Sequence, residues 1–217
     1  MKQIWNTNAG HWVKAVRSGQ IQSRKDTTNR AILDAVLSLE PVHILDMGCG
    51  EGWLVRKLVE ISKCTAVGVD ISSELIEAAR LSDRSSTYLV LDYETITNNP
   101  ASVEGQFDLI IFNYSLFDED IIPILTACKR LLTVDGNLLI QTVHPLSMDG
   151  NNECENGWRE ENFNSFPSQG WQPMPWYYRT FDSWTDTIEQ TGYGIVEYRE
   201  SVNALSGKPV SLIFQLA

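Results

Sequence analysis

Five short, continuously apolar runs recur along the chain, at residues 42–45, 66–69, 87–91, 107–112 and 137–143. Runs of this length without polar alternation are typical of parallel strands that are buried on both faces of a sheet. Between the runs, apolar residues recur with the spacing of an amphipathic helix, as Leu54, Leu58 and Ile61 do. The alternation predicts strand–helix–strand units, in which helices cover both faces of a mostly parallel sheet.

The two ends of the chain complete this picture. Residues 1–40 precede the first strand and show helical periodicity, so we expect an N-terminal helical cap that ends before Pro41. Two β-rich runs, 194–202 and 210–216, flank a short loop and predict an antiparallel hairpin. The expected fold is therefore a single α/β domain over residues 1–217, with a doubly wound seven-stranded sheet that ends in this hairpin.

The segment 144–178 differs in composition from the rest of the chain. It contains three Trp, two Tyr and two Phe among Pro, Asn, Gly and Glu residues. Disordered segments are poor in aromatic residues, so this composition predicts an ordered insertion that forms a substrate pocket or a lid. Its aromatic and guanidinium groups suit an organic substrate that carries a carboxylate or a phosphate, and a packed loop with solvent-facing arginines explains them equally well. The candidate substrate residues are Trp158, Arg159, Tyr177, Tyr178 and Arg179.

The formal net charge of −11 argues against nucleic acid as a partner, because a polyanion is repelled unless basic side chains gather on one face. Residues 1–40 contain six basic and three acidic side chains, but a solvated basic helix explains this excess more simply than a docking surface. The chain has no apolar stretch near the roughly 20 residues of a membrane span and no secretory leader at its start. We therefore expect a soluble, cytoplasmic protein without a membrane partner.

The strongest chemical signal is the glycine-rich sequence from Asp46 to Gly52, where the first strand turns into a helix. Glycine lets the backbone approach a ligand closely, and in an open α/β sheet the ligand lies beyond the carboxyl ends of the strands. A nucleotide-like cofactor is implied. The third glycine comes too early for a dinucleotide fingerprint, and Trp53 is bulky where that fingerprint requires a small residue, which argues against NAD. The adjacent Glu51 either approaches a cofactor ammonium group or favours the helix N-terminus through its charge.

Polar residues end the next three strands, namely Asp70, Asp92 and Asn113. The carboxyl ends of parallel strands meet at one edge of the sheet, so each strand contributes one group to the ligand. Together with the glycine turn and the terminal hairpin, this order resembles the class I, seven-strand S-adenosylmethionine-dependent methyltransferases of the bacterial small-molecule type. The resemblance extends over nearly the whole chain from Val42 onward.

The resemblance implies a role for each of these residues. The glycine turn would lie against the methionyl part of the cofactor, Asp70 would accept hydrogen bonds from the ribose hydroxyls, and Asp92 with Tyr93 would read the adenine. Asn113 would contact the methionyl end, and Arg24 would reach the cofactor carboxylate. The expected cofactor residues are Arg24, Asp46, Gly48, Cys49, Gly50, Gly52, Asp70, Ile71, Asp92, Tyr93 and Asn113.

Two residues are candidates for the catalytic role. By the same resemblance, Tyr114 would face the substrate. His144 directly follows the fifth strand and precedes Pro145, so it stands where that strand opens onto the cofactor edge. Because histidine ordinarily titrates near neutral pH, His144 is the candidate general base, and a structural role in a His-Pro turn is the alternative. We expect no metal site.

The predicted function is transfer of a methyl group from S-adenosylmethionine to an O, N or C atom of a small organic substrate, with S-adenosylhomocysteine as the product. Two alternatives remain open at this stage. One is an RNA or protein methyltransferase that docks through residues 1–40, and the other is a non-catalytic, S-adenosylmethionine-binding regulatory module.

Overall fold

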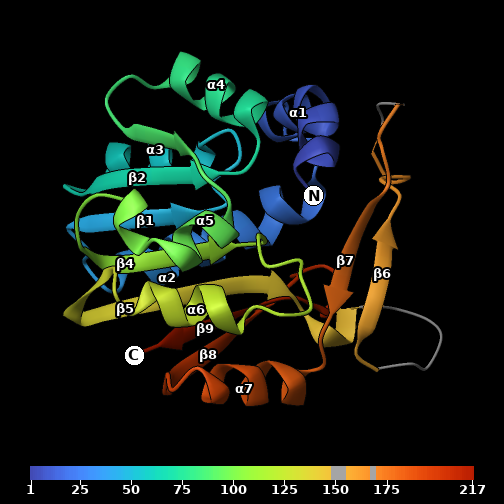
Figure 1. The fold of residues 1–217 in the computed structure, drawn as a ribbon. Coiled ribbons are helices and arrows are strands. Elements are labelled where there is room, and N and C mark those ends of the chain that lie inside the picture. The colour runs from blue at the N-terminus through green and yellow to red at the C-terminus, as the bar shows by residue number, and fades with distance from the viewer. Residues whose placement is uncertain (148–154, 167–169) are drawn as a thin grey trace.

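A seven-stranded sheet forms the centre of the computed structural model, which describes residues 1–147, 155–166 and 170–217 (Figure 1). The strand order is β3-β2-β1-β4-β5-β9-β8. The first five of these strands in the chain pair in parallel, whereas β9 runs antiparallel to both β5 and β8. The predicted doubly wound sheet with a closing antiparallel hairpin is confirmed. The strands are β1 (His43–Met47), β2 (Thr65–Asp70), β3 (Thr87–Val90), β4 (Phe107–Asn113), β5 (Leu132–Val143), β8 (Ile195–Val202) and β9 (Pro209–Leu216).

Helices cover both faces of the sheet, and each face has its own hydrophobic cluster. Alternate side chains of β1 point to opposite faces, so Leu45 packs in one cluster and Ile44 in the other. Leu125 of α6 belongs to the first cluster and Leu58 of α3 to the second. The helices of the first face are α5 (Tyr93–Asn98), α6 (Ile122–Cys128) and α7 (Phe181–Gln190), and those of the second are α2 (Asn29–Leu37), α3 (Trp53–Ile61) and α4 (Ser73–Ser82).

Strand β5 is longer than its apolar run predicts. It begins at Leu132, five residues before the predicted start, and the pair Asp135-Gly136, a sequence typical of a turn, lies within it. The pairing of β4 with β5 shifts register between Phe107 and Leu109, so the turn-forming sequence is accommodated as an irregularity in a continuous strand. Pairing with β4 therefore overrides the local turn preference.

The aromatic insertion forms a second, two-stranded sheet apart from the main one (Figure 1). Strands β6 (Gly157–Glu161) and β7 (Met174–Tyr178) pair antiparallel, and the backbone N–H of Tyr177 donates to the carbonyl of Phe117 at 2.8 Å. The described residues of the insertion thus include two paired strands, and residues 148–154 and 167–169 lie outside the described part of the chain.

The N-terminal cap consists of two helices joined through a π-helical turn. Helix α1 (Lys2–Arg17) packs beside α4, and the turn Arg24–Thr28 leads directly into α2. The buried Asn8 of α1 reaches the insertion, because its amide donates to the carbonyl of Gln172 and accepts from the N–H of the same residue, both at 2.8 Å. Within the described parts of the chain, no helix is both long and apolar enough to span a lipid bilayer.

Candidate cofactor and substrate site

A cavity of about 700 Å³ lies at the carboxyl edge of the parallel strands. Its walls come from α1, the π-helical turn, the glycine-rich turn, the ends of β2 to β5 and the β6–β7 hairpin. Ten of the eleven predicted cofactor residues line it, and Gly52 stands beside it at the start of α3. The ten are Arg24, Asp46, Gly48, Cys49, Gly50, Asp70, Ile71, Asp92, Tyr93 and Asn113.

The glycine-rich turn is held against the end of β2. The N–H groups of Gly48 and Cys49 both donate to the carbonyl of Val69, at 2.8 and 2.9 Å. Gly48 has a φ of +78°, and a Cβ placed there would lie 2.4 Å from the Cβ of Ser115. Only glycine fits this position, because a side chain would meet both a left-handed backbone and a neighbouring side chain.

Asp70 is fixed by the same turn. One of its oxygens accepts from the N–H of Gly50 and the other from the N–H of Ser72, both at 2.8 Å. Burial raises the pKa of Asp70 to about 6, although the backbone hydrogen bonds from Ser72 and Gly50 oppose that shift. The carboxylate lines the cavity with a fixed orientation, and each oxygen has a second lone pair for a ligand hydroxyl.

Asp46, at the end of β1, is almost fully buried. Its Oδ1 has no hydrogen-bond partner among the described residues. Burial is the main cause that raises its pKa, to about 7, with a further rise from the nearby Asp70 and a partial offset from Arg24. A buried carboxylate without a partner is costly, so a ligand that donates hydrogen bonds or carries positive charge would stabilise it.

Arg24 lies across the cavity on the π-helical turn. Its guanidinium stacks 4.7 Å from the ring centroid of Trp53 and 5.9 Å from that of Trp12, and its Nε donates to Oδ1 of Asn29 at 3.1 Å. Burial lowers its pKa to about 10, so it remains charged at neutral pH. Its buried Nη2 has no hydrogen-bond partner among the described residues. Arg24 is thus positioned to bind an anionic group.

Asp92, the acidic residue after β3, caps a helix as well as lining the cavity. Oδ1 of Asp92 accepts from the N–H of Thr95 at 2.7 Å and so caps α5, a short helix that the sequence pattern did not predict. Hydrogen bonds to Thr95 lower the pKa of Asp92. The neighbouring Tyr93 is directed inward, where its hydroxyl donates to the carbonyl of Met47 at 3.2 Å. Tyr93 therefore supports the glycine turn from behind as well as lining the cavity.

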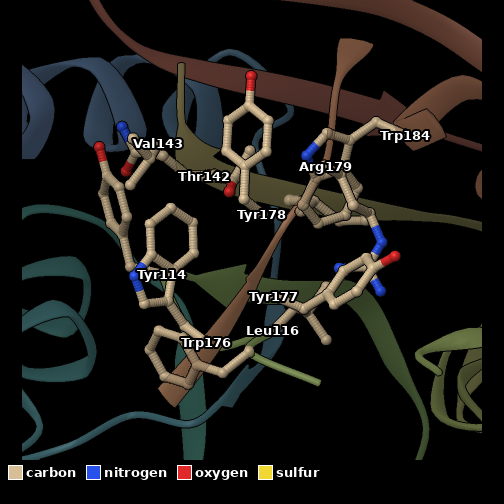
Figure 2. Close-up of a pocket in the computed structure, with 12 residues that line it drawn as sticks. Tyr114, Leu116, Thr142, Val143, Trp176, Tyr177, Tyr178, Arg179 and Trp184 are labelled. Atoms are coloured by element: carbon tan, nitrogen blue, oxygen red, sulfur yellow. The ribbon is translucent and has the colours of Figure 1, made fainter. Parts of the chain in front are cut away.

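Tyr114 follows β4 with a φ of +53°, a left-handed conformation that is rare for a residue with a side chain. It lines both the main cavity and a smaller one (Figure 2). Burial raises its pKa to about 12, so the hydroxyl stays protonated at neutral pH and acts as a hydrogen-bond donor. Beside it, Asn113 lines the main cavity, and its buried Oδ1 has no partner among the described residues.

His144 lies outside both described cavities, although it directly follows β5. Its Nδ1 accepts from the N–H of Leu146 at 3.0 Å, and its Nε2 lies 2.9 Å from Oε1 of Glu200. The first contact places the proton on Nε2, which then donates to Glu200. Both ring nitrogens are therefore engaged in the turn after β5. This geometry fits the structural alternative for His144 and not the predicted general base.

The predicted substrate residues are also distributed differently from the expectation. Tyr177, Tyr178 and Arg179 line the smaller cavity, of about 30 Å³, between β7 and the ends of β4 and β5 (Figure 2). The exposed Trp158 and its neighbour Arg159 line neither cavity. Arg159 instead donates to the carbonyl groups of Trp158 and Glu155, at 3.1 and 2.9 Å.

Arg179 is buried but binds the chain itself. Its Nη2 donates to the carbonyls of Asp118 and Glu119, at 2.7 and 2.5 Å, and its guanidinium packs on the rings of Tyr177 and Trp184. The side chain therefore anchors the loop after β4 to the start of α7. The expected arrangement, in which guanidinium groups of the insertion receive an anionic substrate group, is not found in the main cavity.

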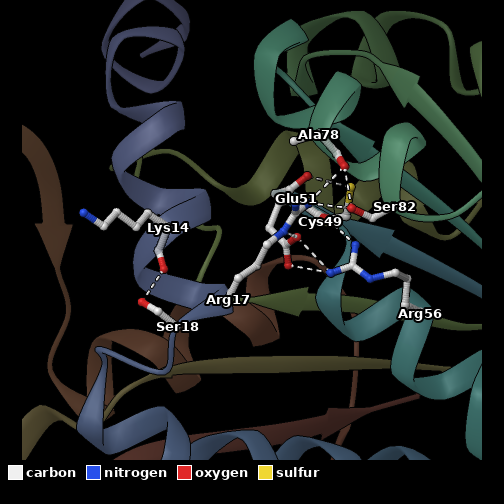
Figure 3. A network of polar contacts seen from close by, with 9 residues as sticks. Lys14, Arg17, Ser18, Cys49, Glu51, Arg56, Ala78 and Ser82 are labelled. Atoms are coloured by element: carbon white, nitrogen blue, oxygen red, sulfur yellow. Dashed lines mark hydrogen bonds and ion pairs between the residues drawn. The ribbon is translucent and has the colours of Figure 1, made fainter.

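Glu51 takes neither of the two roles considered from the sequence. It is buried between two arginines, with Oε2 at 2.8 Å from Nε of Arg17 and Oε1 at 2.8 Å from Nη2 of Arg56 (Figure 3). Arg17 also donates to the carbonyl of Ala78 and to the hydroxyl of Ser82 on α4. This network fixes the end of α1 to the glycine turn. Arg17 is held by this network although it is exposed, and Arg24 lines the cavity, which reduces the basic surface available for docking RNA or a partner protein.

Sequence reasoning missed most of the apolar lining. Trp5 and Trp12 of α1 meet edge-on with ring centroids 5.6 Å apart, and both line the cavity. An amphipathic pattern alone does not tell which element its apolar face will cover. Further large apolar side chains that line the cavity include Phe117, Phe163, Phe166, Met174 and Trp176.

The fold and the cavity define the class of the protein, a doubly wound α/β domain with a ligand-sized cavity at the carboxyl edge of its sheet. A family described as a methyltransferase domain matches residues 40–189, and the chain belongs to this family. The match covers strands β1 to β5 of the main sheet, the β6–β7 hairpin and the helices between them, and it ends before β8 and β9.

Solved structures share the fold at low sequence identity. An S-adenosylmethionine-dependent methyltransferase from Clostridium acetobutylicum is 16% identical with a TM-score of 0.63, and the alignment covers 95% of this chain and 96% of that one. Magnesium protoporphyrin IX methyltransferase from Synechocystis, solved with bound S-adenosylmethionine, is 15% identical with a TM-score of 0.61, over 99% and 93% of the two chains.

A ubiquinone biosynthesis O-methyltransferase from Xanthomonas oryzae is 30% identical over 115 residues. These residues are 52% of this chain and 47% of that relative. The alignment thus spans about half the length of the curated relatives that the chain matches.

Proposed function

We propose that this chain is an S-adenosylmethionine-dependent methyltransferase that acts on a small organic molecule. The observation that carries the proposal is a set of three buried polar atoms, each without a described partner, around one cavity: Nη2 of Arg24, Oδ1 of Asp46 and Oδ1 of Asn113. Buried polar groups are normally satisfied, so unsatisfied ones in a cavity indicate a ligand. One donor and two acceptors match the carboxylate and ammonium groups of an amino acid.

The rest of the cavity fits the nucleoside part of the same molecule. Asp70 presents fixed carboxylate oxygens for vicinal hydroxyls, as its raised pKa of about 6 still allows at neutral pH. Ile71 and Leu91 provide apolar surface for a flat base, and Asp92 supplies an acceptor at its edge. The methyltransferases named above support this assignment, since one of them was solved with bound S-adenosylmethionine.

When bound, S-adenosylmethionine supplies a methyl group on a positively charged sulfur, so that an acceptor atom needs mainly to be aligned with it. The chain's own contribution is therefore geometric. The apolar walls from α1 and the β6–β7 hairpin exclude water, and Tyr114 lines the cavity while its hydroxyl is hydrogen-bonded to the side chains of Ser211 and Thr28. With His144 engaged in a turn, the acceptor atom would attack the methyl group as a neutral nucleophile, and its proton would then pass to solvent.

Calorimetric titration with S-adenosylhomocysteine and with NAD tests the cofactor assignment. We expect saturable binding of S-adenosylhomocysteine and no comparable binding of NAD. Tighter binding of NAD would contradict the proposal. Binding of S-adenosylmethionine without formation of S-adenosylhomocysteine across a broad panel of metabolites would favour the regulatory module instead.

A further inference from the structure

The end of the main cavity near the β6–β7 hairpin has a distinctive charge. Among the described residues that line the cavity, six side chains are carboxylic acids, and Arg24 is the one basic side chain. Arg24 sits between Trp12 and Trp53, where the proposed function assigns it to the cofactor carboxylate. The hairpin end therefore offers an incoming substrate negative charge from Glu161 and Asp118.

Glu161 is the better placed of these two carboxylates. It is half-buried at the end of β6 and pairs with Met174 across the hairpin, and both residues line the cavity. Its Oε1 accepts from the N–H of Phe163 at 2.6 Å, which fixes the orientation of the carboxylate. Trp176, two residues after Met174 on the same face of β7, brings its indole to the same cavity.

Aromatic rings line the same cavity as this carboxylate. Phe163 stacks on Trp171 with centroids 4.4 Å apart, and the rings of Trp5 and Phe117 lie 5.8 Å apart. Phe163, Trp5 and Phe117 line the cavity together with Trp176. Flat aromatic walls combined with a fixed carboxylate are a favourable environment for an organic cation, because ring faces and carboxylate attract positive charge together.

Two arginines of the insertion and its following segment are close in sequence but do not reverse this charge. Arg159 is turned along β6 to the carbonyls of Trp158 and Glu155, and its guanidinium lies 5.3 Å from the ring centroid of Tyr178. Arg179 is held by the carbonyls of Asp118 and Glu119. Neither side chain lines the main cavity.

We propose that the methyl acceptor is a flat, largely apolar molecule that carries a protonated nitrogen, which Glu161 and the ring of Trp176 recognise. The inference rests on the proposed function for the location of the cofactor. This cationic substrate differs from the substrate with a carboxylate or phosphate that the composition of the insertion suggests. The protonated nitrogen is a recognition group, and the acceptor atom is a separate, uncharged nucleophile on the same molecule.

The test compares two probes of similar size and opposite charge, phenethylamine and 3-phenylpropionate. Each is titrated into the full chain saturated with S-adenosylhomocysteine and observed by ligand-detected NMR. We expect phenethylamine to bind about tenfold more tightly than 3-phenylpropionate. Glu161→Gln, which keeps the acceptor for the N–H of Phe163, should abolish the preference, whereas Glu160→Gln on the adjacent, exposed residue should retain it.

A second pair of variants tests the contribution of the aromatic ring separately from that of the carboxylate. Trp176→Leu should weaken phenethylamine binding, and Trp158→Leu, at an exposed position of the same hairpin, should not. Absent binding of phenethylamine, equal or tighter binding of 3-phenylpropionate, or a preference that persists in Glu161→Gln overturns the inference. Calorimetry with S-adenosylhomocysteine alone separates the two proposals, because its failure to bind refutes the proposed function, whereas binding without an amine preference refutes only the substrate class.

Discussion

At the scale of single residues, Arg24 is the most direct test of how the cofactor lies. Arg24→Gln removes the charge that would bind the cofactor carboxylate, and a hydrogen bond to a charged group contributes about 1.5–3 kcal/mol. Affinity for S-adenosylhomocysteine should fall by roughly 10- to 100-fold. Affinity for 5′-methylthioadenosine, which lacks the amino-acid group, should change little.

The control for this variant is Lys25→Gln, which removes a neighbouring, exposed charge on the same turn. It should leave both affinities unchanged. An equal loss of affinity for the two ligands in Arg24→Gln would mean that Arg24 shapes the cavity without binding the carboxylate.

Asp46 and Asp70 predict a pH dependence of binding, because burial raises their pKa values to about 7 and about 6. Hydroxyl and ammonium groups of the ligand require the two carboxyl groups to be ionised. At a pH below their pKa values, binding must therefore release protons from them. Affinity for S-adenosylhomocysteine should rise from pH 5 to pH 7, by up to about tenfold per unit for each carboxylate that titrates. Calorimetry in buffers of different ionisation enthalpy measures the released protons, and their absence at pH 6 would contradict the assignment.

The same shifts affect folding in the opposite direction. A carboxyl group with a raised pKa in the folded protein holds its proton where the unfolded chain, with an ordinary pKa of 3.8, has lost it. Without ligand, the free energy of unfolding should therefore decrease as the pH rises from about 4 to about 7. Denaturant titrations of the protein and of Asp46→Asn test this, since the variant should lose the upper part of the slope.

His144 should affect stability more than binding. His144→Asn removes the buried contact with Glu200 and the acceptor for the N–H of Leu146, and an unsatisfied buried group costs about 1–3 kcal/mol. We expect a lower melting temperature with nearly unchanged affinity for S-adenosylhomocysteine. Unchanged stability together with lost methyl transfer would restore the general base that the sequence predicted.

At the scale of elements, α1 and the β6–β7 hairpin act as one cover over the cavity because Asn8 joins them. The side-chain amide of Asn8 donates to the carbonyl of Gln172 and accepts from its N–H, which is the pair of hydrogen bonds that a neighbouring strand would form. Asn8→Ala leaves both groups without this partner, so binding of S-adenosylhomocysteine should weaken through a less stable cover. Thr7→Ala, an exposed position on the same helix, is the control, and equal effects of the two variants would refute the role of Asn8.

At the scale of the whole molecule, ligand binding should stabilise this cover more than the sheet. Hydrogen exchange of α1, β6 and β7 should slow on addition of S-adenosylhomocysteine, while β1 and β4, which are central and buried, should change little. If α1 and the hairpin are already as protected as β1 in the free protein, they form a fixed wall, and substrate must enter without their movement.

The succession of strands and helices along the chain could be predicted from the sequence because its signals are local. Apolar runs of strand length, separated by helical spacing, leave few arrangements for a parallel sheet, and the right-handed crossover rule restricts them further. The lengths of individual helices and strands were predicted less well. Six residues of α5 are too few to show a helical period, and the turn sequence at 135–136 gave way to pairing between β4 and β5.

The sequence by itself determined the sheet, the glycine turn and the polar strand ends that line one edge, because each depends on a residue's own backbone or its place in a strand. Only the tertiary structure decided which side chains of α1 and the β6–β7 hairpin form the opposite wall of the cavity. Glu51 pairs with Arg17 from 34 residues away, and Asn8 meets Gln172 across 164 residues. No local pattern encodes such contacts, so the role of His144 and the charge of the substrate end depend on how distant segments pack together.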